Sequence, residues 1–252
     1  MKNNQSSQGK LTLKSGHTFF GKIFGSLEPQ VGEIIFNTSM SGYQEVITDL
    51  SYTDQIICFT YPHIGNVGTN EEDLESYTGG CKGIVIRETT KITSNWRNKE
   101  DLSSFLKKKN VTGISGIDTR KLTRILREEG SQPAVISQEE FSDKKIQSLF
   151  DSFGDLKGKD LAKKVTCHKN YNWDEGSIGI NKPESKFLVV AYDFGVKHNI
   201  LRLLVDRGCD IKVVSAKTSP EEVLNMNPDG IFLSNGPCLL YTSPSPRDTN
   251  ES

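Results

Sequence analysis

The chain has 252 residues, 35% of them hydrophobic and 25% charged, a composition typical of a globular protein with about two domains. The 31 basic and 32 acidic residues give a net charge of −1, so there is no electrostatic reason to expect nucleic acid or a membrane as a partner. Residues 1–10 are too polar for a signal peptide, and no apolar run approaches the roughly 20 residues of a membrane span, so we expect a cytoplasmic protein.

Short strands dominate the first half of the chain. Alternating apolar residues around Leu11 and over 18–23, separated by the turn residues Ser15 and Gly16, predict a β-hairpin. Further strands are predicted at 33–37, 55–60 and 83–87. The segments between them, 38–52 and 61–80, are predicted to be loops.

Helices are predicted after the strands. Asn98 is expected to cap a helix over 99–109, and Asp118 to cap one over 119–129 that ends at Gly130. Ser137 and Glu140 have the spacing of a capping box for a helix reaching about residue 150. Strands followed by helices predict an α+β domain over residues 1–152.

The pattern weakens over residues 153–185. Asp, Gly, Lys and Asn dominate there, with Tyr171 and Trp173 as isolated aromatic residues. We predict a linker that lies across both domains.

A second domain, over 186–237, has alternating strands and helices. The apolar run 187–192 is typical of a parallel strand covered on both faces. A helix over 197–207 follows, with Ile200, Leu203 and Leu204 expected to face inward and Gly208 to end it. A strand at 211–215, a helix begun by a capping box at 219–222, and a strand at 231–234 complete the pattern. Right-handed crossovers predict an α/β open sheet with these three strands parallel. Residues 238–252 follow no hydrophobic period.

The loops after the first and third of these strands are the places for chemistry. The first, 193–197, has one glycine, which argues against the glycine-rich nucleotide-binding motifs. In the other, 235–237, Gly236 could expose backbone groups to a small polar substrate; an ordinary β-turn is the alternative.

The five cysteines include no C-x-x-C pair, so the sequence gives little support for a metal site. Cys58 and Cys209 are predicted to be small core residues. His63 is expected to be a structural loop residue rather than a partner contact. Four basic residues could either dock an acidic partner or form a solvated helix face: Arg120, Lys121, Arg124 and Arg127.

Longer motifs point to a family. Segments 36–49 (FNTSMSGYQEVITD), 61–70 (YPHIGNVGTN), 117–124 (IDTRKLTR) and 191–195 (AYDFG) resemble the small-subunit family of carbamoyl-phosphate synthase. The loop 233–237 (LSNGP) resembles that of class I glutamine amidotransferases. The resemblance covers about residues 10–237.

The resemblance implies a flavodoxin-like amidotransferase fold and hydrolysis of L-glutamine to glutamate and ammonia. The ammonia would pass to a large subunit that makes carbamoyl phosphate from bicarbonate and ATP for arginine and pyrimidine synthesis. Ser51 and Gly236 match glutamine-binding positions, whereas Cys238 replaces a second glycine of the family loop. No cofactor is expected on this chain; ATP and metal ions would bind the large subunit.

The family's catalytic Cys, His and Glu follow the LSNGP loop, and no position here matches them. Cys238 lacks the glycines of a nucleophile elbow and is not expected to be the nucleophile. We expect the chain to be truncated within the amidotransferase domain, with an artefactual tail at 238–252. A non-catalytic module that binds the large subunit and a flavodoxin-like ligand-binding protein remain alternatives.

Overall fold

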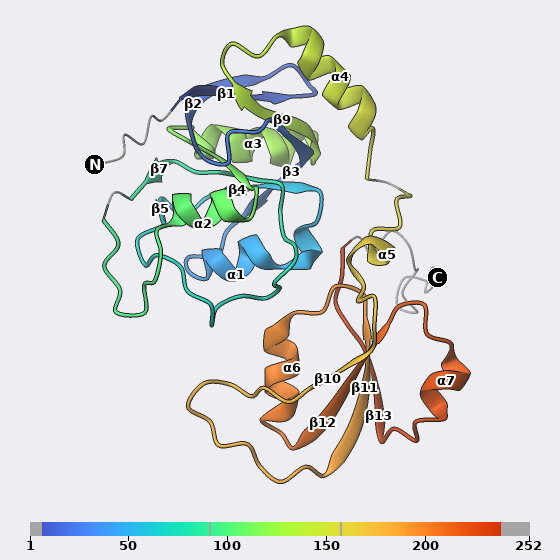
Figure 1. Ribbon diagram of the computed structural model, residues 1–252. Coiled ribbons are helices and arrows are strands. Elements are labelled where there is room, and N and C mark those ends of the chain that lie inside the picture. Colours follow the sequence, from blue (N-terminus) through green and yellow to red (C-terminus); the bar gives the residue numbers. More distant parts are fainter. Residues whose placement is uncertain (1–6, 91, 157, 238–252) are drawn as a thin grey trace. The chain divides into compact units, whose positions relative to one another are not determined.

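The computed structural model describes residues 7–90, 92–156 and 158–237 (Figure 1). Contacts divide the chain into two compact units. Of the described residues, the first takes in 7–48, 54–74, 80–90 and 92–156, and the second 49–53, 75–79 and 158–237. The two short segments of the second unit lie within residues 1–152, which the sequence assigned to the first domain.

A closed barrel forms the first unit, with strand order β1-β2-β8-β6-β4-β3-β9. The strands are β1 (Gln8–Leu13), β2 (Thr18–Gly25), β3 (Gln30–Asn37), β4 (Gln55–Phe59), β6 (Gly83–Val85), β8 (Thr112–Ser115) and β9 (Gln132–Gln138). β4 pairs in parallel with β3 and β6, and β6 with β8, whereas the remaining pairs are antiparallel. The predicted hairpin is confirmed as the β1–β2 pair, and the strands predicted at 33–37, 55–60 and 83–87 correspond to β3, β4 and β6.

Alternation along β9 separates two apolar clusters. Ala134 and Ile136 join the main core with Leu11 of β1, whereas Val135 packs against α4 (Asp143–Phe153). Successive side chains of a strand point to opposite faces, so β9 can serve both clusters at once. The main core also takes the apolar side chains of α3 (Thr119–Glu129), and α2 (Leu102–Lys108) packs against β2 and β8.

Helix α3 matches its prediction. Asp118 caps it by accepting a hydrogen bond from the Lys121 N–H at 2.9 Å, and the helix gives way to Gly130 at φ +85°. The cap predicted at Asn98 is wrong: Asp101 caps α2, and the Asn98 amide donates to Thr93 Oγ1 instead.

The capping box predicted at Ser137 and Glu140 is also wrong. Ser137 is buried in β9, opposite Lys10 of β1, because the barrel needs this segment as a strand. Helix α4 begins later, after Ser142. The predicted loops are also partly regular, since they contain α1 (Tyr43–Thr48), the short helix η1 (Leu50–Tyr52) and the small β5 (His63–Ile64), which pairs with β7 (Glu88–Thr89).

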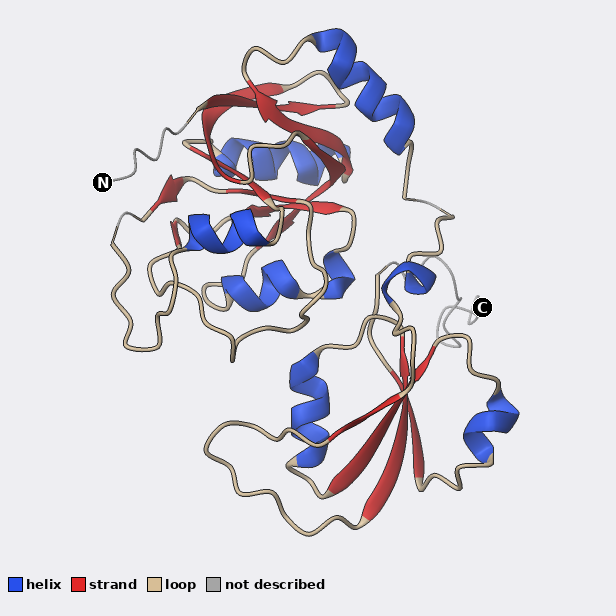
Figure 2. Cartoon of the chain, in the orientation of Figure 1, coloured by secondary structure: helices blue, strands red, loops and turns tan. Residues whose placement is uncertain are grey.

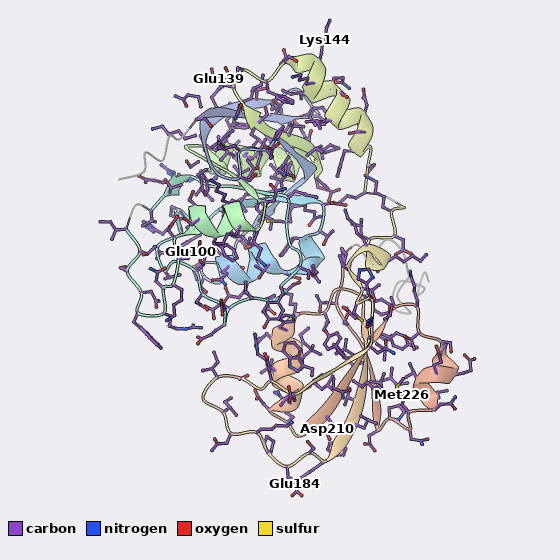
Figure 3. All side chains as sticks on the ribbon, viewed as in Figure 1. Glu100, Glu139, Lys144, Glu184, Asp210 and Met226 are labelled. Carbon is purple, nitrogen blue, oxygen red and sulfur yellow. The ribbon has the colours of Figure 1, made fainter. Side chains whose placement is uncertain are left out.

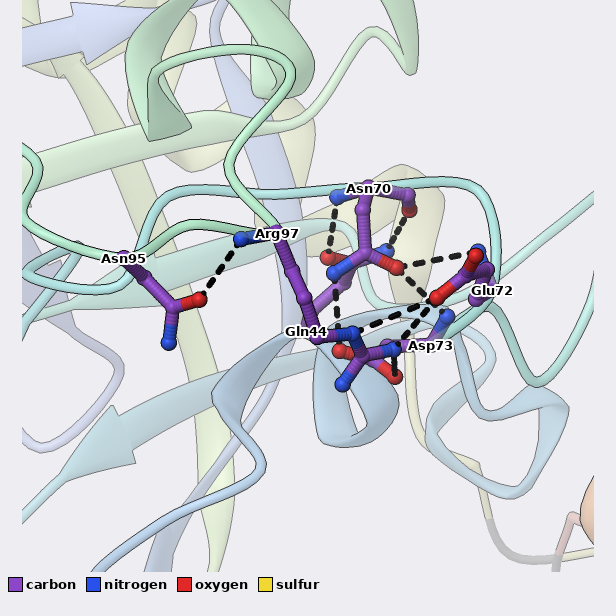
Figure 4. Close-up of polar contacts among 6 residues, drawn as sticks. All are labelled: Gln44, Asn70, Glu72, Asp73, Asn95 and Arg97. Atoms are coloured by element: carbon purple, nitrogen blue, oxygen red, sulfur yellow. Dashed lines mark hydrogen bonds and ion pairs between the residues drawn. The ribbon is translucent and has the colours of Figure 1, made fainter. Parts of the chain in front are cut away.

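A polar network holds residues 70–73, in the middle of the 61–80 loop (Figure 4). The side chain of Gln44 in α1 donates to the Asn70 carbonyl and accepts from the Asn70 N–H at 2.9 Å. The Arg97 guanidinium donates to Asp73 at 2.6 Å and to Glu72 at 2.9 Å. Within the loop, the Asn70 amide donates to Asp73 at 2.8 Å. The loop is thus bound to α1 through Gln44 and to Arg97 through Glu72 and Asp73.

An open four-stranded sheet forms the second unit, in the order β10-β12-β11-β13. The strands are β10 (Tyr171–Trp173), β11 (Phe187–Asp193), β12 (Cys209–Ser215) and β13 (Gly230–Leu233). β11 is parallel to both β12 and β13, which confirms the prediction of three parallel strands. β10 adds an antiparallel edge, and α5 (Ala162–Val165) precedes it, so the predicted linker contains regular structure.

Two helices cover opposite faces of this sheet (Figure 2). α6 (His198–Val205) buries Leu201 and Val205 against Ala191, and α7 (Pro220–Leu224) buries Val223 against Val190 and Val214. The capping box predicted at Ser219 and Glu222 is confirmed. The inward orientation predicted for Leu203 is wrong: this side chain is exposed because Leu201 and Val205 occupy the face toward the sheet.

Cys58 and Cys209 are buried, as predicted. Within the described ranges, no helix is long and apolar enough to cross a membrane. In the same part of the chain, no three His, Cys, Asp or Glu side chains are grouped so that they could hold a metal ion.

Candidate functional site

The candidate site lies where strands β11 and β13 end. β11 is flanked by β12 on one side and β13 on the other, and the connecting helices pack on opposite faces. In open α/β sheets such a reversal leaves a crevice at the carboxyl ends of the strands, where ligands bind. The loops 193–197 and 234–237 meet at this edge.

The two loops approach each other closely. Ser234 Oγ accepts a hydrogen bond from the Phe194 N–H at 2.9 Å and donates to the Asn235 carbonyl at 2.7 Å. A Cβ at Gly236 would lie 2.1 Å from the Phe194 carbonyl oxygen. Only glycine therefore fits at position 236 without displacing backbone.

Asn235 joins three segments of the second unit. Its Nδ2 donates to Ser51 Oγ at 2.9 Å and to the Gly195 carbonyl at 3.1 Å, and its Oδ1 accepts from the Lys197 N–H at 3.1 Å. Ser51 is 184 positions away in the sequence, yet a side-chain hydrogen bond holds it at the loop after β13. The structure thus brings Ser51 and the Asn235-Gly236 loop, both pointed out by the sequence, to one place.

The segment around Ser51 is fixed by a buried carboxylate. Asp49 caps η1 by accepting from the Ser51 N–H at 2.8 Å, and its other oxygen lies 2.8 Å from the Lys197 ammonium. Burial lowers the pKa of Lys197, but the hydrogen bond and charge of Asp49, with the charge of Glu75, outweigh it, so the pKa lies above its usual value. Lys197 therefore stays a cation, as a partner of Asp49 requires.

Asp193 shapes the loop after β11. One carboxylate oxygen accepts from the N–H groups of Gly195 and Val196, both at 2.9 Å, and the other from the Cys167 N–H at 2.8 Å. Gly195 has φ +110°, which a side chain would strain. These bonds set the direction in which the chain enters α6.

Glu75 closes the amino end of α6. Its carboxylate accepts from the Asn199 N–H at 3.0 Å, and its carbonyl accepts from the His198 N–H at 3.2 Å. A carboxylate here satisfies free helix N–H groups and complements the helix dipole.

His198 follows on the same helix, buried between two aromatic rings. The ring centroids of Tyr77 and Trp173 lie 4.8 and 4.7 Å from that of His198. Burial, aided by the positive charge of Arg202, lowers the pKa of His198 to about 4. The imidazole is therefore neutral near pH 7.

Three polar groups of Gly236 and Ser51 can take part in ligand binding. Among the described residues, the N–H and C=O of Gly236 have no hydrogen-bond partner, and the Ser51 hydroxyl accepts from Asn235 without donating. A hydroxyl and an N–H are donors suited to a carboxylate or carboxamide oxygen.

The cysteines in the described part of the chain are poorly suited to nucleophilic attack. Burial raises the pKa of Cys58 and of Cys81 to about 12, and burial with the nearby charge of Asp193 raises that of Cys167 to about 11. A thiol reacts as its thiolate, so these groups are unreactive at neutral pH. Cys238 lies outside the described residues, as does the whole segment 238–252.

Some residues of the site were not predicted from the sequence. Asp49 and Asp193 lie in segments that carried the family resemblance, and Lys197 lies in the loop 193–197, but none of the three was assigned a role. Glu75 lies in no such segment. Asn235 belongs to the LSNGP loop that the sequence singled out, but only Gly236 of that loop was assigned a role. His63 is exposed in β5, where its ring lies edge-on to that of Tyr61 with the centroids 5.7 Å apart.

Family models match most of the chain. Residues 11–136 match the description "Carbamoyl-phosphate synthase small chain, CPSase domain", and residues 190–248 match "Glutamine amidotransferase class-I". The second match extends past Pro237, the last residue of the resemblance seen in the sequence.

Curated relatives agree with these models. The chain is 53% identical over 247 residues to the carbamoyl phosphate synthase small chain of Salmonella typhi, covering 94% of this chain and 64% of that protein. It is 54% identical to that of Salmonella typhimurium and 53% to that of Escherichia coli K12, each over 236 residues, 90% of this chain and 62% of the relative. The chain thus spans less than two thirds of the length of these proteins. It is a mixed α/β chain containing the start of a class I glutamine amidotransferase domain, and it belongs to the carbamoyl-phosphate synthase small chain family.

Proposed function

We propose that this chain is the glutamine-binding subunit of a cytoplasmic carbamoyl-phosphate synthase. L-Glutamine binds at Ser51 and Gly236 and is hydrolysed to glutamate and ammonia by the complete amidotransferase domain. The ammonia passes to a large subunit, which holds ATP and metal ions and makes carbamoyl phosphate for arginine and pyrimidine synthesis. The relatives' shared name and the amidotransferase match support this assignment.

One observation carries the proposal: the hydrogen bond of 2.9 Å between Asn235 and Ser51. By accepting from Asn235, the Ser51 oxygen leaves its proton free to donate to a carboxylate of glutamine. The N–H of Gly236 is a second donor at the same edge of the sheet. Hydrogen bonds to a charged group contribute about 1.5–3 kcal/mol each, so both donors would strengthen the binding of the glutamine carboxylate.

Titration calorimetry of the purified chain with L-glutamine tests the proposal. Ser51→Ala removes the hydroxyl and should weaken binding roughly 10- to 100-fold. Ser185→Ala is the matched control. Ser185 precedes β11, at the amino ends of the strands and away from the site, and its hydroxyl donates to Asp210. Equal glutamine affinity in Ser51→Ala and the unchanged chain would refute the role of Ser51.

A second candidate function is a binding module without glutaminase activity. The raised thiol pKa values of Cys58, Cys81 and Cys167 favour it, because hydrolysis needs a thiolate beside a positioned imidazole. Ammonia release by the purified chain separates the two candidates. The module predicts none with or without the large subunit, and steady release that disappears in Cys238→Ala would contradict it.

A further inference from the structure

Four arginines line one cavity on the barrel unit. Arg120, Arg124 and Arg127 come from α3, and Arg87 follows β6. The cavity measures about 560 Å³ and is also lined by Thr60, Thr119 and Thr123. We call this cavity, with its four guanidinium groups, the arginine groove.

These guanidinium groups form no ion pair within the part of the chain that the structure describes. Arg97 of the same unit shows the contrast, since it binds both Glu72 and Asp73. Asp118 and Glu128 line the neighbouring cavity beside Arg120 and Arg124 without pairing to them.

The spacing on α3 brings like charges together. Arg120 and Arg124 are four residues apart and Arg124 and Arg127 three apart, so all three share one helix face. Like charges at these spacings destabilise a helix by a few tenths of a kcal/mol per pair. Repulsion among the guanidinium groups therefore lowers the stability of α3 in the free chain. A negatively charged ligand would relieve that repulsion.

The spacing of the arginines along α3 favours an extended ligand. Seven residues of helix separate Arg120 from Arg127, which is about 10 Å along the axis. One phosphate cannot reach groups spread over that length, whereas carboxylates at intervals along a peptide can. Guanidinium groups bind carboxylates through paired N–H donors. The Thr123 hydroxyl donates to the Thr119 carbonyl and Thr119 is buried, so Thr60 is the lining threonine whose hydroxyl can donate to a peptide carbonyl.

We propose that the arginine groove docks an acidic segment of a partner protein. Several carboxylates of the segment lie along α3, each facing a guanidinium group, and Arg87 binds from the other wall. The docking depends on charge and on the line of arginines, not on the glutamine site.

Fluorescence anisotropy with a labelled octaglutamate peptide tests the proposal on the full chain, with octaglutamine as the neutral probe. The chain should bind octaglutamate, more weakly as salt rises, and should not bind octaglutamine. Arg124→Gln/Arg127→Gln should weaken octaglutamate binding at least about fivefold. The matched control is Lys99→Gln/Lys144→Gln, which removes the same charge from exposed positions outside the groove; Lys144 projects outward from α4 (Figure 3). Its binding should stay within about twofold of the unchanged chain.

Folding is checked separately, since removing like charges from α3 should leave the thermal midpoint unchanged or slightly raised. Equal weakening in both double variants would overturn the proposal, because binding would then follow net charge alone. Displacement of the peptide by orthophosphate at equal concentration would also overturn it, in favour of a small-anion site.

Discussion

Replacing Gly236 by alanine should destabilise the second unit through one contact. The added Cβ would lie 2.1 Å from the Phe194 carbonyl oxygen and 2.9 Å from the Phe194 carbonyl carbon, whereas ordinary contacts begin at 3.4 Å. Both obstacles are backbone atoms, so one of the two loops must move by about 1 Å rather than a side chain turning aside. Overpacking of this kind costs about 1–3 kcal/mol of unfolding free energy.

Tryptophan fluorescence during thermal unfolding reports on the second unit, where the effect of Gly236→Ala is expected. Trp173 is buried in the second unit, whereas Trp96 is 89% exposed and should change little on unfolding. For a unit of this size each kcal/mol lowers the midpoint by roughly 4–8 °C. Gly230→Ala is the matched control, because its Cβ would meet only Val189 at 3.9 Å. If Gly236→Ala melts with the unchanged chain, the close approach of the two loops is refuted.

Two further changes test the support around the site. Glu75→Ala removes the acceptor for the Asn199 N–H and should cost about 0.5–2 kcal/mol by urea unfolding, while Glu184→Ala, at an exposed position (Figure 3), should cost little; equal losses would show that Glu75 does not cap α6. His198 has a folded pKa of about 4, below its unfolded value of 6.5, so its contribution is present above pH 6.5 and lost as the pH falls toward 4. The loss should be on the order of 1–3 kcal/mol, followed by Trp173 fluorescence, and His198→Asn should flatten it; an unchanged pH profile would contradict the neutral, buried imidazole.

Local signals in the sequence predicted elements whose residues satisfy one another. Asp118, the apolar face of α3 and Gly130 all agree, so this helix was correct at both ends. The same holds for the capping box at Ser219 and for the apolar run of β11. In each case the atoms that decide the structure lie within a few residues of each other.

Long-range pairing decided the segments that were wrong. Ser137 and Glu140 have the spacing of a helix cap, but Ser137 lies in β9 because this segment pairs with β1 and β3. Tyr171 and Trp173 looked like isolated aromatics in a linker, yet they form β10 because β12 offers an edge. A pattern confined to a few residues cannot report a partner that lies far along the chain.

The candidate site shows the same division. Gly236 stood out because it ends a strand, and Ser51 was found only through the family resemblance. The roles of the side chains that hold Ser51 were not predicted. Asn235 reaches Ser51 across 184 positions, and Asp49, which caps the segment of Ser51, pairs with the distant Lys197. Whether Ser51 and Gly236 bind glutamine stays a prediction.

Amide chemical shifts of the labelled chain during titration with L-glutamine test the central claim most directly. Ser51, residues 193–197 and residues 234–236 should shift together with one affinity, and D-glutamine should leave them unchanged. Shifts confined to other parts of the chain, or the same response to both enantiomers, would contradict a glutamine site at the carboxyl ends of β11 and β13.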